Sequence, residues 1–177
     1  LAVAPYHVDA LLPEDTPDYI QTAYQSLHYH AITTVYLCYA QAVKLPAPLT
    51  GFFDGTAQWV LHRGALGLPD NEVAVVISVS DCTEAWKDKD LAEKIHADIK
   101  RVCPDLGKPE AVRIITEKRA TTAATVDFVQ PDFSWLHHRR IYPAGDYLHP
   151  RYPATLEAAV QSGFAAAEKL MLDLRVE

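Results

Sequence analysis

Three segments rich in β-branched and aromatic residues follow one another in the middle of the chain. They span residues 32–39, 56–63 and 73–79, with Gly and Pro residues between them. Residues of these types favour strands, because their side chains pack well on a pleated surface. Consecutive strands without an intervening helix favour a mixed sheet over a doubly wound fold. We therefore predict an α/β protein of the α+β type, with a mixed β-sheet and flanking helices.

Other periodic segments lie on both sides of this block. Helices are predicted at 18–27, 91–102 and 155–174. Shorter strands are predicted at 1–4, 112–116 and 140–144. The residues from Asp81 to Glu84 have the form of a capping box, which predicts a helix start at Asp81.

The composition excludes several classes of protein. The chain has 16 Lys and Arg against 23 Asp and Glu, a formal net charge of −7, which argues against nucleic-acid binding. Uninterrupted apolar stretches such as residues 73–77 are far shorter than the roughly 20 residues of a membrane-spanning helix. Cys38, Cys82 and Cys103 form no CxxC pair, so we expect neither a disulfide framework nor a zinc site. A cytoplasmic protein is the simplest interpretation.

The strongest local feature lies near the C-terminus. A predicted strand ends in Gly145-Asp146, a loop with two prolines follows, and a helix is predicted to begin on Thr155. Helix N-termini carry unpaired N–H groups and partial positive charge, so they bind anions and electron-rich carbonyls. The alternative is a helix packed tightly on a sheet, with Asp146 as an ordinary turn residue. The residues alone leave both interpretations open.

Other motifs give weaker evidence for a functional site. His28 and His30 could form a metal pair, but no third ligand accompanies them, so no metal site is predicted. The run from His137 to Arg140 is interpreted as a solvated basic surface. The sequence contains no GxSxG, GxGxxG or Walker loop, which excludes a free-standing dinucleotide-binding domain.

The string AGDYLHPRYPATLEAAVQSGFAAAE, residues 144–168, resembles the C-terminal flavin-binding segment of the flavin-containing amine oxidase and phytoene desaturase superfamily. The opening LAVAPYHVDALLP is similar to the strand and proline turn with which the chain leaves the flavin domain in that superfamily. Three interior strings, ITTVYLCY, AQWVLHRG and EKRATTAAT, resemble the squalene-associated, FAD-dependent desaturase branch, which includes the hydroxysqualene dehydroxylases. The resemblance covers essentially the whole chain.

The resemblance implies a cofactor site. It assigns FAD binding to Ala144, Gly145, Asp146, Ala154, Thr155 and Leu156. Asp146 would hydrogen-bond the ribityl or pyrophosphate region, and Gly145 would allow close approach. The Leu156 N–H would face the N1–C2=O edge of the flavin, where helix-terminus electrostatics stabilise negative charge. No catalytic side chain is assigned.

The resemblance also implies a division of the chain. Residues 1–30 would be a partial FAD-domain strand with connecting helices, 31–128 a substrate-binding domain, and 129–177 a return to the FAD-binding domain. Tyr36 and Trp59 are candidates for the wall of an apolar substrate cavity, with core packing as the alternative role.

The implied function is flavin hydride transfer to or from a polyisoprenoid such as hydroxysqualene, squalene or a carotenoid-like molecule. Because the GxGxxG half is absent from this sequence, we expect a C-terminal piece of a longer enzyme, with Leu1 marking a cut. By itself the piece would be inactive and would not retain FAD. Its expected partners are the N-terminal FAD-binding half and a lipophilic small molecule, with peripheral association at the inner face of the membrane as a further possibility.

Two alternatives remain. An amine oxidase would need an aromatic pair, for which Tyr147 and Tyr152 are the candidates. A non-catalytic module that binds an apolar ligand or a protein would fold alone with a closed cavity. An exposed apolar surface would instead favour the C-terminal piece of a longer enzyme.

Overall fold

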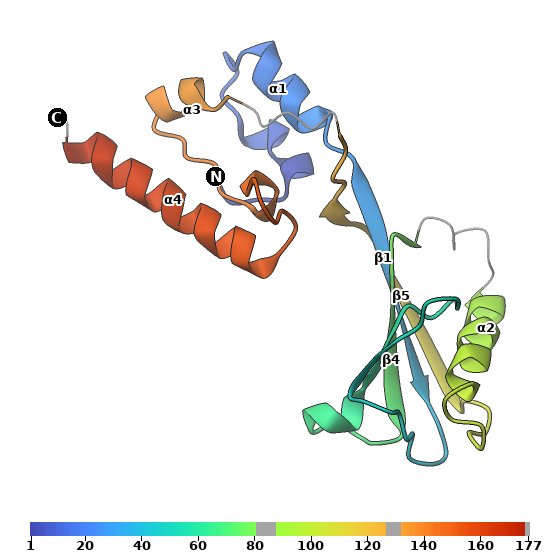
Figure 1. Cartoon of the computed structure of the whole chain (residues 1–177). Helices are drawn as coiled ribbons and strands as arrows, with labels where there is room; N and C mark the ends of the chain where they lie inside the picture. The colour runs from blue at the N-terminus through green and yellow to red at the C-terminus, as the bar shows by residue number, and fades with distance from the viewer. Residues whose placement is uncertain (81–87, 127–131, 176–177) are drawn as a thin grey trace. The chain divides into compact units, whose positions relative to one another are not determined.

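The chain forms two compact units in the computed structural model, which describes residues 1–80, 88–126 and 132–175. Unit 1 combines Leu1–Tyr29 with Thr122–Glu177, and unit 2 is His30–Thr121 (Figure 1). The capping box predicted at Asp81 lies outside the described residues. The predicted α/β class is confirmed, since the described residues combine helices with one five-stranded sheet.

Unit 2 contains a five-stranded antiparallel sheet with the order β2-β3-β4-β1-β5. The strands are β1 (Tyr29–Cys38), β2 (Leu49–Gly51), β3 (Trp59–His62), β4 (Glu72–Ser78) and β5 (Ala111–Thr122). Val75 of β4 lies opposite both Val35 of β1 and Val60 of β3, so the three valines share one face. All three are fully buried, which fixes the register of the central strands.

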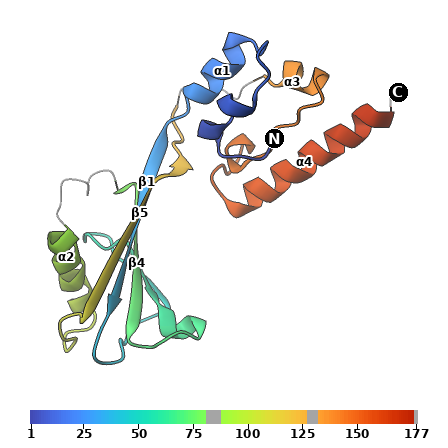
Figure 2. The same ribbon diagram turned by 180° about the vertical axis from the view of Figure 1, so that it is seen from behind.

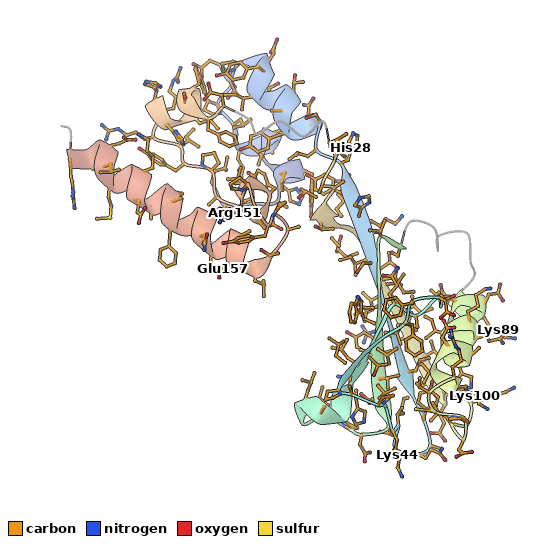
Figure 3. All side chains as sticks on the ribbon, in the orientation of Figure 1. His28, Lys44, Lys89, Lys100, Arg151 and Glu157 are labelled. Atoms are coloured by element: carbon orange, nitrogen blue, oxygen red, sulfur yellow. The ribbon has the colours of Figure 1, made fainter. Side chains whose placement is uncertain are left out.

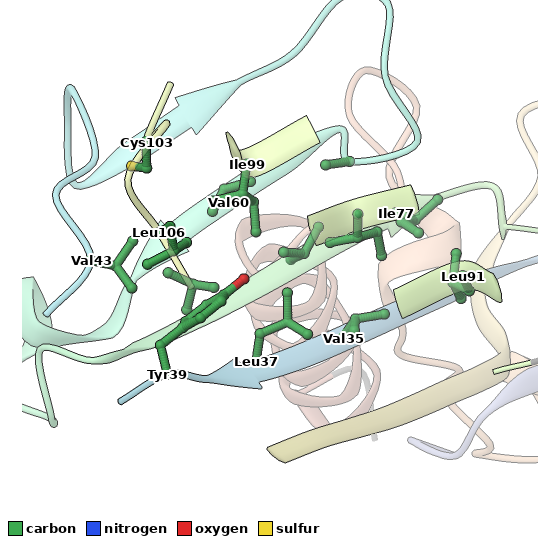
Figure 4. Close-up of a cluster of buried hydrophobic side chains, with 14 residues drawn as sticks. Val35, Leu37, Tyr39, Val43, Val60, Ile77, Leu91, Ile99, Cys103 and Leu106 are labelled. Atoms are coloured by element: carbon green, nitrogen blue, oxygen red, sulfur yellow. The ribbon is translucent and has the colours of Figure 1, made fainter. Parts of the chain in front are cut away.

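Helix α2 (Asp88–Lys100) covers that face of the sheet (Figure 2). Leu91, Ile95 and Ile99 recur at four-residue spacing on the helix, and all three are buried. Figure 4 shows Leu91 and Ile99 among side chains of the strands in the core of unit 2. The amphipathic helix predicted from the apolar residues of 91–102 is therefore confirmed as Asp88–Lys100.

Unit 1 is helical. Its longer elements are α1 (Asp18–Gln25), α3 (Ser134–His138) and α4 (Leu156–Arg175). Short 3-10 helices at Pro5–His7, Asp9–Leu11 and Asp146–Leu148 complete it. Residues from both ends of the chain build one core, in which Val8, Ile20 and Tyr24 pack with Leu136 and Tyr147.

Two predicted strands are wrong. Residues 1–4 and 140–144 form no strand, although the Leu1 amino group donates a hydrogen bond to the Tyr142 carbonyl (2.7 Å) and the Ala144 N–H donates one to the Leu1 carbonyl (2.9 Å). Pro5 and Pro143 have no N–H to donate, so the pairing cannot extend into a ladder. Strand β5, in contrast, continues beyond the predicted 112–116 through the polar residues up to Thr122.

Candidate functional site

The segment before α4 runs along that helix in the opposite direction. The Tyr142 hydroxyl donates a hydrogen bond of 2.9 Å to the Asp173 carboxylate, near the end of α4. The Gly145 N–H donates one of 2.6 Å to Ser162 Oγ, near its start. These two bonds hold residues 142–145 against α4 and place Asp146 beside the beginning of the helix.

Gly145 has a role inside unit 1. Its φ of 173° is extended, so the backbone conformation itself does not require glycine. A Cβ atom at this position would lie 2.3 Å from Cε1 of Tyr147, whose ring is buried. Glycine is therefore needed here for the approach of the Tyr147 ring.

Thr155 caps the start of α4, at the position where the sequence predicts that a helix begins. Its Oγ1 accepts a hydrogen bond of 3.1 Å from the Ala158 N–H and donates one of 2.9 Å to the Tyr152 carbonyl. The N–H groups of Leu156 and Glu157 have no hydrogen-bond partner within the described part of the chain. The start of α4 therefore offers two free donors together with the positive end of the helix dipole.

Asp146 lies close to these donors through the backbone. The Ala154 N–H donates a hydrogen bond of 3.2 Å to the Asp146 carbonyl. The half-buried Asp146 carboxylate has no hydrogen-bond or ion-pair partner among the residues that the structure describes. Ala154 adopts a left-handed φ of 61°, a conformation that costs a residue with a side chain about 1–3 kcal/mol. The strained turn thus brings Asp146 and the start of α4 together.

Sequence reasoning missed a histidine that shapes this loop. His149 Nδ1 accepts hydrogen bonds from the N–H groups of Arg151 (3.2 Å) and Tyr152 (3.3 Å). Its Nε2 lies 3.0 Å from Oε1 of Gln161, and its ring stacks on Tyr152 at 3.8 Å. Because Nδ1 accepts, the proton resides on Nε2, which donates to Gln161. No local sequence pattern marks these contacts.

The charged groups near the start of α4 are mixed. Arg151 and Glu157 both lie at this end of the helix (Figure 3). Arg151 is exposed and has no ion-pair partner among the described residues. Free N–H donors suit an electron-rich carbonyl, and an unpaired carboxylate suits a hydroxyl donor. This donor and acceptor set fits the carbonyl edge of a flavin ring and the hydroxyls of its ribityl chain.

Tyr36 and Trp59 lie on the face of the sheet opposite α2. Trp59 is paired with Val76, and Val76 with Thr34, while Tyr36 is paired with Ala74. Directly paired residues share a face, as do alternate residues of one strand, so Tyr36 and Trp59 point to the same side. Trp59 is 48% exposed and Tyr36 is half-buried, so neither belongs to the buried core.

Arg63 lies at one end of this open face, in contact with Tyr36 and Glu72. The Arg63 guanidinium lies 5.3 Å from the centroid of the Tyr36 ring and forms an ion pair of 2.5 Å with Glu72. At the other end, a Cβ atom on Gly51 would lie 3.1 Å from the Trp59 ring, which therefore rests on the β2 backbone. The face has an apolar, aromatic middle and a charged end.

Other expectations can be compared with the structure. The described residues contain no group of three His, Cys, Asp or Glu side chains that could hold a metal ion. No helix in the described ranges is long and apolar enough to cross a membrane.

Tyr147 is buried against Tyr24, whereas Tyr152 stacks on His149, and no ring contact joins these two described tyrosines. The Tyr147 ring therefore lies in the core of unit 1, whereas the Tyr152 ring lies in the loop before α4.

The sequence profile of the family described as flavin containing amine oxidoreductase matches residues 1–171. The chain belongs to this family.

Two curated relatives agree with the family. The chain is 27% identical over 178 residues to the hydroxysqualene dehydroxylase of Zymomonas mobilis, covering 95% of this chain and 37% of that protein. It is 31% identical over 176 residues to the hydroxysqualene dehydroxylase of Rhodopseudomonas palustris, covering 97% and 38%. The chain thus spans less than two fifths of the length of these relatives.

Two solved structures share the fold. A putrescine oxidase redesigned in its cofactor binding matches with a TM-score of 0.62 and 12% identity, over 97% of this chain and 42% of that one. A reduced UDP-galactopyranose mutase matches with a TM-score of 0.61 and 13% identity, over 88% and 36%. At these identities the likeness concerns the fold alone.

Proposed function

We propose that this chain is the C-terminal part of an FAD-dependent oxidoreductase that acts on a polyisoprenoid alcohol such as hydroxysqualene. The observation that carries the proposal is the start of α4, where two free N–H donors follow a turn that is bonded to the Asp146 backbone, and where the Asp146 carboxylate has no partner among the described residues. The names of the two curated relatives support the substrate class. Their greater length supports an enzyme that also includes a further FAD-binding part.

The residues at the start of α4 would hold one edge of the flavin. The Leu156 and Glu157 N–H groups would donate hydrogen bonds to its C2 carbonyl edge, and the helix dipole would favour negative charge there. Asp146 would accept hydrogen bonds from hydroxyls of the ribityl chain. When bound, FAD supplies the hydride chemistry, which no side chain can provide. Thr155 and Ala154 would position the donors by fixing the first turn of α4.

The open face of the sheet in unit 2 would bind the apolar substrate. Trp59, Leu61 and Val76 offer a partly exposed apolar surface, and the buried face beneath them is held by α2. Such a surface would exclude water from a polyisoprenoid chain and orient it. The Arg63–Glu72 pair would keep the Tyr36 ring in place at the charged end of this face.

This assignment gives the two units different functions. Unit 2 would be the substrate domain, and unit 1 would complete the FAD-binding domain together with the rest of the enzyme. By itself the chain would retain no FAD and would be inactive, because it has no GxGxxG loop for the pyrophosphate. A lipophilic substrate would place the enzyme at the cytoplasmic face of a membrane.

The test uses the full-length gene product. It should purify with flavin absorbance and convert hydroxysqualene when a reductant for the flavin is supplied. Asp146→Ala should lower the flavin content, whereas Asp90→Ala, at an exposed acid of α2, should leave it unchanged. Purified protein without flavin would contradict the assignment of the cofactor. Unchanged flavin content in Asp146→Ala would contradict the role of Asp146 alone.

A further inference from the structure

The apolar part of the open sheet face ends at a pair of opposite charges. Val76, Ala74 and Glu72 alternate along β4 and therefore point to the same side of the sheet. Val76 and Glu72 are four positions apart, which corresponds to about 13 Å along the strand. The apolar surface on this strand is therefore of limited length, and Glu72 lies at its end.

Arg63 is fixed at the same end by two contacts. Its guanidinium forms the ion pair of 2.5 Å with Glu72 and lies 5.3 Å from the centroid of the Tyr36 ring. The side chains of Arg63 and Glu72 are only 28% and 27% exposed, so protein already covers most of their surface. A hydrocarbon chain laid over them would remove the remaining water from two charges without offering a hydrogen bond, which is costly. The pair therefore opposes an apolar chain that extends beyond Tyr36.

The space beyond Tyr36 is open. A pocket of about 150 Å³ lies there, lined in part by Tyr36, Arg63, Glu72 and Arg113. An apolar cavity of similar volume holds a molecule of benzene, so the pocket has room for one isoprene unit. Arg113 adds a further charge, because its side chain is exposed and has no ion-pair partner among the residues that the structure describes. Charge, and not lack of room, therefore ends the apolar face.

We infer that Arg63 and Glu72 are specificity-determining residues, which set the length of the polyisoprenoid chain that the open face accepts. The inference rests on the proposed function, in which this face binds the apolar substrate. A chain that ends at or before Tyr36 leaves the charged pair in contact with water. A chain that is one isoprene unit longer must cover the pair and enter the charged pocket.

The test removes both charges in the full-length gene product. Arg63→Met/Glu72→Leu leaves no unpaired charge, and apolar replacement of both partners of a buried ion pair is often neutral for stability. Arg101→Met/Asp54→Leu is the matched control, since this ion pair of 2.9 Å also lies in unit 2 but directly after α2. Dissociation constants for linear polyisoprenoid alcohols of increasing length are measured from the change in protein fluorescence.

The wild-type protein should bind successive chains more tightly up to one length and gain nothing from a further isoprene unit. In Arg63→Met/Glu72→Leu the first chain beyond that length should bind at least about tenfold more tightly than in the wild type, because one more apolar unit is buried. The control variant should keep the wild-type limit. Arg113→Leu, at an exposed position where misfolding is not expected, should raise the affinity for the same chain about threefold or more.

An unchanged length limit in Arg63→Met/Glu72→Leu and in Arg113→Leu would overturn the inference. Equal weakening of chains of every length would also overturn it, because the ion pair would then only support the Tyr36 ring. If hydroxysqualene is converted and the limit is the same in all variants, the proposed function stands and the inference alone fails. If no chain binds to any of the proteins, the proposed use of the open face fails, and the inference fails with it.

Discussion

Helices α2 and α4 differ in where their apolar side chains are buried. Helix α2 buries Leu91, Ala92, Ile95 and Ile99 against the sheet of unit 2. Helix α4 is longer, yet it buries only Ala158 and leaves most of its large apolar side chains exposed. Most helical stability in proteins comes from the packing of an apolar face. The first helix therefore has its partner within the chain, while the second depends on its cap and on a few side-chain bonds.

The largest expected effect lies in α2. Replacing Ile95 with Ala removes a fully buried side chain from the core of unit 2. The free energy of unfolding should fall by about 2–5 kcal/mol, since the loss of burial adds to the cost of a cavity. Urea unfolding followed by circular dichroism measures it. The control Glu93→Ala, at an exposed ion pair with Lys89, should change stability by no more than about 0.5 kcal/mol. If Ile95→Ala lowered the free energy of unfolding only slightly, α2 and α4 would not differ in what their apolar side chains contribute to stability.

A smaller effect is expected at the cap of α4. In Thr155→Ala the Ala158 N–H loses its acceptor, which costs about 0.5–2 kcal/mol at the helix start. Hydrogen exchange at the Ala158 amide, followed by NMR, should accelerate. Thr155→Ser retains a hydroxyl acceptor and should restore the slower exchange. Equal exchange in all three proteins would show that packing, and not the cap, holds this end.

A still smaller effect concerns pH. Burial, and then the charges of Lys100 and Lys108, lower the pKa of His96 on α2 from its ordinary value of 6.5. The unfolded chain therefore takes up this proton more readily than the folded one. The stabilising contribution should be complete above 6.5 and should be lost as the pH falls from that value through the folded pKa. NMR titration of the ring protons should give a midpoint below 6.5. A higher midpoint would contradict the partial burial of His96 beside Tyr39.

The smallest effect is expected at Phe164, on the exposed apolar side of α4. Phe164→Ala in the 177-residue chain should change the free energy of unfolding by no more than about 0.5 kcal/mol, because the side chain is mostly exposed. Binding of an apolar dye should decrease at the same time. A loss of stability comparable to that of Ile95→Ala would mean that α4 is packed within this chain. The difference described between α2 and α4 would then be wrong.

Sequence patterns predict the elements whose buried face is evident from the spacing of apolar residues within the element itself. The spacing of Leu91, Ile95 and Ile99 and the apolar run of β4 are sufficient for their helix and strand, because one face of each is buried. Strand β2 was missed, since Leu49–Gly51 is short, follows a proline-rich connector and exists through its pairing with β3. Helix α3 is a single short turn without a strong periodicity.

The candidate site shows the same limit. The cap at Thr155 could be predicted because it depends on adjacent residues. The contact of His149 with Gln161 spans 12 positions and that of Gly145 with Ser162 spans 17, so neither leaves a local signal. The left-handed conformation of Ala154 was also beyond prediction, since alanine does not favour it.

The composition of unit 1 from both ends of the chain has a consequence for the order of folding during synthesis. Unit 2 is one continuous stretch, His30–Thr121, and it can fold as soon as that stretch has emerged from the ribosome. The first 29 residues must wait for their partners. The bond from the Leu1 amino group to Tyr142 alone spans 141 positions, and contacts so distant in sequence form slowly. Residues 1–29 therefore complete their packing only after unit 2 and the later residues of unit 1 have been made.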